Sequence, residues 1–124
     1  MTMKTFAPAV AFVLLVGGAA VAQENPDRIA ALAREARTAT EHADVAKRYR
    51  VHAEALESRA AELDARAAQM SASSRSIASK WPSMAPRTLT ETRQHAAEAR
   101  RAAQDSRLLA ERHQTLAVEA LAAQ

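Results

Sequence analysis

The chain has 124 residues, of which 33 are alanine, with two glycines, four prolines, no cysteine and 3% aromatic residues. This composition favours one all-α domain, argues against a β-sheet enzyme and excludes a disulfide-bonded scaffold. The formal net charge is only +3 and the basic runs are short, so we expect no nucleic-acid binding, which normally needs a basic stripe.

Residues 1–22 have the pattern of a cleaved export signal. Lys4 makes the start basic, and residues 6–16 form an apolar stretch that is too short for a comfortable membrane span. Ala20 and Ala22 then provide the small residues of a cleavage site before Gln23. We therefore expect a periplasmic or secreted mature protein, residues 23–124, with no stable membrane span after cleavage.

A first helix is predicted over residues 26–78. Asn25 is a suitable N-cap, Pro26 suits the first helical position, and Asp27 is favourable at the positive end of the helix dipole. Neither proline nor glycine interrupts the chain from there to residue 78. Five serines between residues 71 and 79 weaken the end of this helix, and the sequence leaves open whether it is continuous there.

A loop is predicted over residues 79–87, because Pro82 and Pro86 cannot continue a helix. A second helix is predicted over residues 88–122. Thr88 and Glu91 have the spacing of a capping box at its start.

Alanine recurs every seventh residue in both predicted helices, and in the first helix larger residues follow three positions later. This is a heptad pattern, with alanine at position a and the larger residues at position d. The predicted interaction seam consists of Ala39, Ala46, Tyr49, Ala53, Leu56, Ala60, Leu63, Ala67, Met70, Leu89, Ala96, Ala103, Leu109, Ala110, Leu116 and Ala117.

The predicted fold is therefore all-α, a long antiparallel helical hairpin that forms an alanine-rich coiled coil. The first arm is longer than the second, so we expect it to overhang, bend or fray near its start. Residues whose numbers add up to about 165–168 should lie opposite each other. Because one hairpin leaves Leu108 and Leu121 outside the seam, we expect a homodimer, packed as a four-helix bundle.

Two histidines, His52 and His113, could then lie within a turn of each other on opposite arms. Two imidazoles with a nearby carboxylate could bind Zn²⁺ or Cu²⁺. Neither helix has the HxxxH or HxxH spacing of strong helical metal sites, so solvated or seam-edge histidines are the plainer interpretation. We expect no metal, no cofactor and no enzymatic activity, because no glycine-rich phosphate loop or nucleophile turn exists after residue 18.

Residues 41–50 (EHADVAKRYR) and 53–56 (AEAL) resemble a stretch shared by small uncharacterised alanine-rich exported proteins of proteobacteria. That resemblance implies a helical hairpin and no assigned activity. Residues 89–94 (LTETRQ) are similar to the LTxxQ motif of the Spy/CpxP-type periplasmic chaperones, with one more residue between threonine and glutamine.

The leading functional hypothesis is a non-enzymatic exported protein that acts through self-association or by docking on another envelope protein. The alternative is a chaperone or stress protein that binds unfolded clients on an arginine-rich face. A third is a periplasmic metal-binding protein that uses its histidines.

Overall fold

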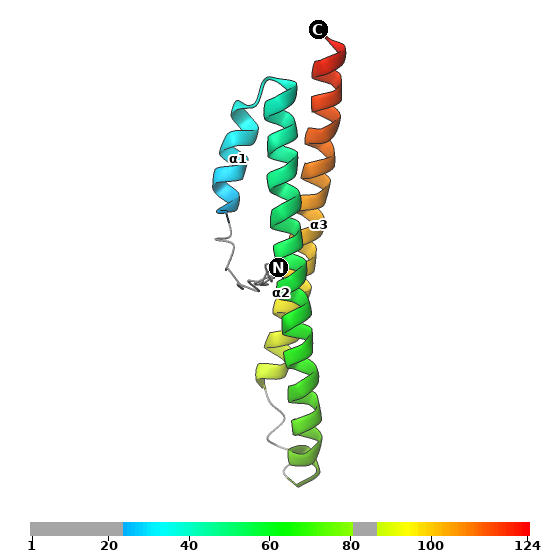
Figure 1. Cartoon of the computed structure of the whole chain (residues 1–124). Coiled ribbons are helices and arrows are strands. Elements are labelled where there is room, and N and C mark those ends of the chain that lie inside the picture. Colours follow the sequence, from blue (N-terminus) through cyan, green and yellow to red (C-terminus); the bar gives the residue numbers. More distant parts are fainter. Residues whose placement is uncertain (1–23, 81–86) are drawn as a thin grey trace, which may run out of the picture.

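The structure is a computed structural model that describes residues 24–80 and 87–124. It contains three helices, α1 (Pro26–Glu35), α2 (Ala39–Lys80) and α3 (Arg87–Ala122). The two long helices pack side by side and run antiparallel (Figure 1). The predicted all-α helical hairpin is therefore confirmed. The proposed export signal and most of the predicted loop, residues 81–86, lie outside the described residues.

Helix α1 begins where the sequence predicts. The side chain of Asn25 accepts a hydrogen bond of 2.9 Å from the backbone N–H of Asp27, and Pro26 occupies the first helical position. Glu24, just before this cap, forms an ion pair with Arg48 of α2. The start of α1 is therefore held against α2 by a charged contact.

The prediction of one continuous helix over residues 26–78 is wrong. Ala36 is extended, with ψ at 130°, and α2 starts afresh at Ala39. Thr38 and Glu41 form a capping box: the N–H of Glu41 donates to Thr38 Oγ1, and Glu41 Oε2 accepts from the N–H of Thr38 at 3.0 Å. The helix breaks because these side chains provide a second helix start in place of the continuing backbone ladder.

Glu41 also accepts a 2.6 Å hydrogen bond from the backbone N–H of Arg37. The two backbone donors lower the pKa of the Glu41 carboxyl, because they stabilise its charged form. Arg37 meanwhile caps the end of α1, since its Nη1 donates to the carbonyl oxygens of Arg34 and Ala36 at 2.8 and 2.9 Å. The connection over residues 36–38 is thus fixed on both sides by side chains.

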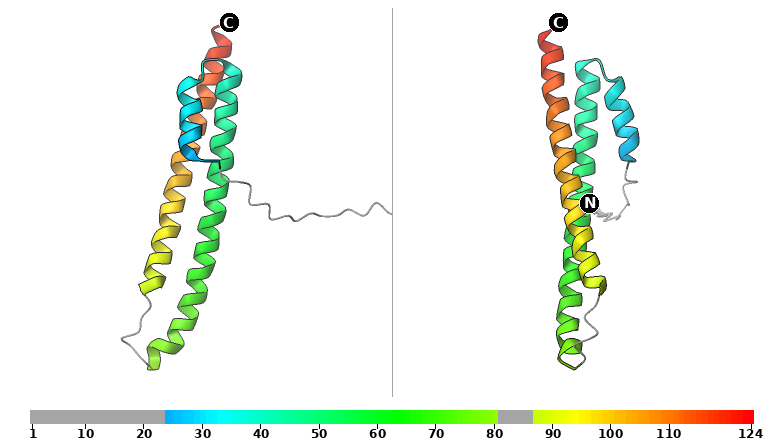
Figure 2. Two further views of the ribbon diagram at one scale, coloured as in Figure 1. Left: turned by 90° about the vertical axis from the view of Figure 1, so that its left-hand side faces the viewer. Right: turned by 180° about the vertical axis from the view of Figure 1, so that it is seen from behind.

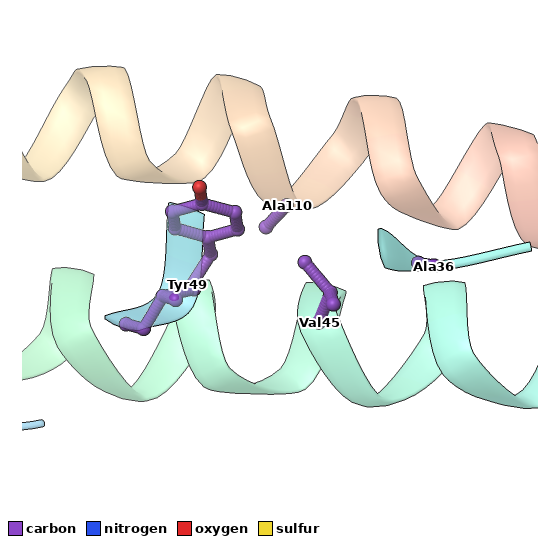
Figure 3. Close-up of a cluster of buried hydrophobic side chains, with 5 residues drawn as sticks. Ala36, Val45, Tyr49 and Ala110 are labelled. Atoms are coloured by element: carbon purple, nitrogen blue, oxygen red, sulfur yellow. The ribbon is translucent and has the colours of Figure 1, made fainter. Parts of the chain in front are cut away.

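After this break, α1 lies antiparallel to the first part of α2, at the end of the hairpin where the C-terminus lies (Figures 1 and 2). We call this region the three-helix end. Its core joins Ile29, Val45, Tyr49 and Ala110 from all three helices, and Ile29 is fully buried. In Figure 3, Tyr49 reaches from α2 toward α3, beside Ala110. The predicted overhang of the first arm is therefore a fold-back.

Polar side chains fix the register of α2 against α3. Three cross-helix pairs recur at intervals of seven residues on each arm, and the two numbers of each pair add up to 164. These pairs, which we call the e-position ladder, are Arg50–Gln114, Glu57–Arg107 and Asp64–Arg100. The numbers of the ring contacts Tyr49–His113 and His42–His113 add up to 162 and 155, so the predicted values of 165–168 are too high along the whole hairpin.

The ends of the long helices differ modestly from prediction. Helix α2 is continuous through the serines to Lys80. Helix α3 starts at Arg87, so Thr88 lies inside the helix, where its carbonyl accepts a 2.7 Å bond from the Thr92 hydroxyl. Glu91 pairs with Arg87 at 3.3 Å, and the capping box predicted at Thr88 is therefore wrong. The predicted end at residue 122 is confirmed.

Candidate functional site

The predicted seam lies inside the hairpin. Each of its alanines is at most 9% exposed: Ala39, Ala46, Ala53, Ala60 and Ala67 in α2, and Ala96, Ala103, Ala110 and Ala117 in α3. Its larger residues are less enclosed: Tyr49 is buried, Leu109 is 38% exposed, and Leu56, Leu63, Met70, Leu89 and Leu116 are half-buried. Because α2 and α3 cover each other's alanines, the seam is already occupied within one chain. A partner has to use another surface.

Three polar residues complete the seam, and sequence reasoning had singled out only His113 among them. Thr92, Ser106 and His113 are all buried, and each lies three positions after a heptad a position of α3. Together with Ala99 they form the d positions that face α2. The heptad spacing could have identified them, but their polarity concealed the signal.

His113 lies against His42, and in the part of the chain that the structure describes no hydrogen bond or ring contact joins His113 to His52. The Nδ1 atoms of His42 and His113 are 3.0 Å apart, and their ring centroids are 5.3 Å apart. One Nδ1 must therefore carry a hydrogen and donate a hydrogen bond to the other Nδ1. His42 is a d-position residue and faces the seam, whereas His52 precedes the seam residue Ala53. Among the described residues, His52 Nδ1 is buried without a hydrogen-bond partner.

In residues 24–80 and 87–124, no group of three or more His, Cys, Asp or Glu side chains is placed to hold a metal ion. His95, the remaining histidine, lies 3.3 Å from Glu98 on the surface of α3.

The surroundings of His113 make it a poor base. Burial, followed by the proximity of His42 and Arg112, lowers the pKa of His113 below its ordinary value of 6.5. The ring of His113 also stacks on Tyr49, with centroids 6.0 Å apart. Burial raises the pKa of the Tyr49 phenol, and Arg34 opposes that rise. His113 and the Tyr49 phenol therefore both favour their neutral forms.

These rings open onto a hollow of about 330 Å³ at the three-helix end. Three arginines line it, Arg34 and Arg37 from the α1 side and Arg112 from α3, so we call it the arginine hollow. Its apolar lining is Ala30, Ala33, Ala36, Leu109 and Leu116. Within residues 24–80 and 87–124, no carboxylate lines it. The fold-back of α1 creates this site, which is why a prediction of one straight helix could not find it.

The carboxylates of this region gather in a different place. A smaller hollow of about 140 Å³, lined by α1 and α2 without α3, contains Glu35, Glu41 and Asp44. Positive and negative side chains are thus separated at the junction of α1 and α2. In the described part of the chain, Arg34, Arg37 and Arg112 form no ion pair, whereas Arg48, Arg87, Arg100 and Arg107 each do.

The outer surface of α3 carries large apolar side chains. Leu108, Val118 and Leu121 are 64%, 57% and 61% exposed. They occupy heptad positions f, b and e on one side of the helix. Val118 and Leu121 are one turn apart, whereas Leu108 lies ten residues, about 15 Å, before Val118, with the exposed residues Glu111, Gln114 and Thr115 between them. No helix in the described part of the chain is both long enough and apolar enough to cross a membrane.

Comparisons with known proteins find no matching family model, no matching curated protein and no matching solved structure.

Proposed function

We propose that this protein is a non-enzymatic interaction protein of the cell envelope that self-associates through the outer face of α3. The observation that carries the proposal is the exposure of Leu108, Val118 and Leu121 on one side of α3, each more than half exposed. Burying large aliphatic side chains stabilises an association by about 1.5–3 kcal/mol for each side chain that is fully covered. We call these three residues the α3 apolar face.

The proposed partner is a second copy of the same chain. In each hairpin the alanine seam is covered internally, so two hairpins can meet through their outer faces without opening. A twofold dimer is the commonest assembly of this kind, and two hairpins side by side form a four-helix bundle. Docking of the same face on another envelope protein is the alternative that the experiment separates.

The proposed location is the periplasm or the exterior of the cell. It is supported by the basic start, the apolar stretch over residues 6–16, and the small residues Ala20 and Ala22 before Gln23. The absence of cysteine means that the protein needs no oxidative folding there. The non-enzymatic character is supported by the lack of glycine after residue 18, since phosphate loops and nucleophile turns depend on it.

Sedimentation equilibrium of residues 23–124 at low micromolar concentration tests the proposal. We expect a dimer whose dissociation follows mass action. Val118→Lys should shift the protein toward monomer, because it places a charge in the interface. Val51→Lys is the matched control, since Val51 is also an exposed helical valine, 46% exposed, but lies on α2.

A monomer mass at every concentration, with full helical circular dichroism, would overturn self-association. Equal effects of the two valine variants would show that the α3 apolar face is not the interface. Cross-linking in the intact envelope would then reveal whether this face docks on a different protein.

A further inference from the structure

We propose that the arginine hollow binds a small carboxylate that carries an apolar group. The charge of the lining is the first argument. Three guanidinium groups provide up to five N–H donors each, and the planar fork of arginine matches the two oxygens of a carboxylate. Without a carboxylate of its own in the lining, the hollow can bring an anion into contact with these donors without displacing an internal ion pair.

The carboxylate beside the connection between α1 and α2 is already engaged. Glu41 follows the connection to α1, but its Oε2 accepts the backbone N–H groups of Arg37 and Thr38, and it lines the smaller hollow instead. Arg37 is held in place through Nη1, which donates to two carbonyl oxygens at the end of α1. Its guanidinium is therefore fixed at the hollow before a ligand arrives, which lowers the entropy cost of binding.

The size and the apolar lining determine the second half of the ligand. A bare inorganic anion would fill only part of about 330 Å³ and would leave Leu109 and Leu116 without a contact. A ligand with an aromatic or branched aliphatic group can cover these leucines while its carboxylate reaches the arginines. The hollow thus combines apolar side chains that can cover such a group with polar side chains that can fix its orientation.

Three elements have to be present together to form this site. Arg34 belongs to α1, Tyr49 to α2 and Arg112 to α3, and all three line the hollow. A ligand that bridges them should stabilise the packing of α1 on the hairpin, because a ligand that binds only the folded arrangement shifts the equilibrium toward it. Binding should therefore also protect the amides of α1 from hydrogen exchange.

For the test, the full chain is expressed, and the protein is purified with whatever N-terminus the cell leaves on it. Isothermal titration with benzoate measures binding, and benzyl alcohol and inorganic phosphate are the comparison ligands. We expect benzoate to bind at least tenfold more tightly than either, because the alcohol lacks the charge and phosphate lacks the apolar group. Arg34→Gln and Arg112→Gln should each weaken benzoate binding about tenfold or more, since each removes a charge-assisted contact.

Matched controls are available on the same helices. Arg28→Gln in α1 and Arg101→Gln in α3 remove exposed arginines that do not line the hollow, and they should leave benzoate binding unchanged. Arg34 and Arg112 are also exposed, so helical circular dichroism should be the same for all four variants. No benzoate binding at millimolar concentration, equal weakening by the control variants, or equal binding of benzyl alcohol would each overturn the proposal.

Discussion

Ala53 is 0% exposed between α2 and α3, so a larger side chain at this position has to push the two helices apart. Replacing its methyl group by the isobutyl group of leucine overpacks the seam and should lower the free energy of unfolding by about 1–3 kcal/mol. For a domain of about 100 residues, each kcal/mol corresponds to a fall in Tm of about 4–8 °C. Ala53→Leu should therefore melt several degrees below the parent protein.

Ala65→Leu is the matched control, because Ala65 is exposed on the same helix and leucine is nearly as good a helix former as alanine. Its Tm should stay within a degree or two of the parent value. Both variants are measured by thermal unfolding with circular dichroism at one protein concentration, because self-association makes Tm depend on concentration. Equal Tm values for the two variants would refute the assignment of alanine to the close contact between the helices.

Thr38→Ala should lower the free energy of unfolding by about 1 kcal/mol, because it removes an N-cap hydroxyl, and hydrogen exchange should show faster opening of α1. The lowered pKa of His113 means that the unfolded chain takes up a proton at higher pH than the folded chain. The stability linked to His113 is therefore complete above pH 6.5 and is lost as the pH falls from 6.5 through the lower pKa of the folded state, so Tm against pH should flatten in His113→Gln. Glu57→Arg should lower Tm by placing like charges opposite Arg107, and adding Arg107→Glu should restore it; an unrestored Tm would contradict the register of the e-position ladder.

The long helices could be predicted because their signal is repeated many times. Alanine at every seventh position marks one face of each arm, and the structure buries those alanines from Ala39 to Ala67 and from Ala96 to Ala117. Composition and the prolines after residue 80 were sufficient for the hairpin as a whole. A pattern of this kind predicts the helix even where one position departs from it, because each heptad repeats the same signal.

The break before α2 was missed because it depends on one local competition. Residues 38–41 read Thr-Ala-Thr-Glu, which has the same capping-box spacing as Thr88 and Glu91, yet no proline or glycine draws attention to it. The outcome was the reverse of the prediction, since Thr38 caps a helix and Thr88 lies within one. Tertiary contacts decide whether an internal capping box starts a new helix or lies within a continuous one. Here the burial of Ile29 against α2 and α3 favours the fold-back of α1.

The arginine hollow could not be predicted for the same reason. Arg34 and Arg112 are far apart in the chain and are placed together only after α1 reverses direction. The pairing of His113 with His42 likewise depends on which face of α2 meets α3 and on the axial register of the two helices, and loop length alone determines neither.

A seam made of one small residue at every seventh position has a mechanical consequence: it is nearly the same before and after a slide of one heptad. Such a slide, about 10 Å along the axis, would again place alanine between the helices. The e-position ladder opposes it only in part, because Glu57 would meet Arg100 while Arg50 would meet Arg107. Tyr49, enclosed by Ile29 of α1 and Ala110 of α3, has no equivalent one heptad away. The packing of α1 on Tyr49 therefore favours one axial position of α2 against α3 over the positions displaced by a heptad.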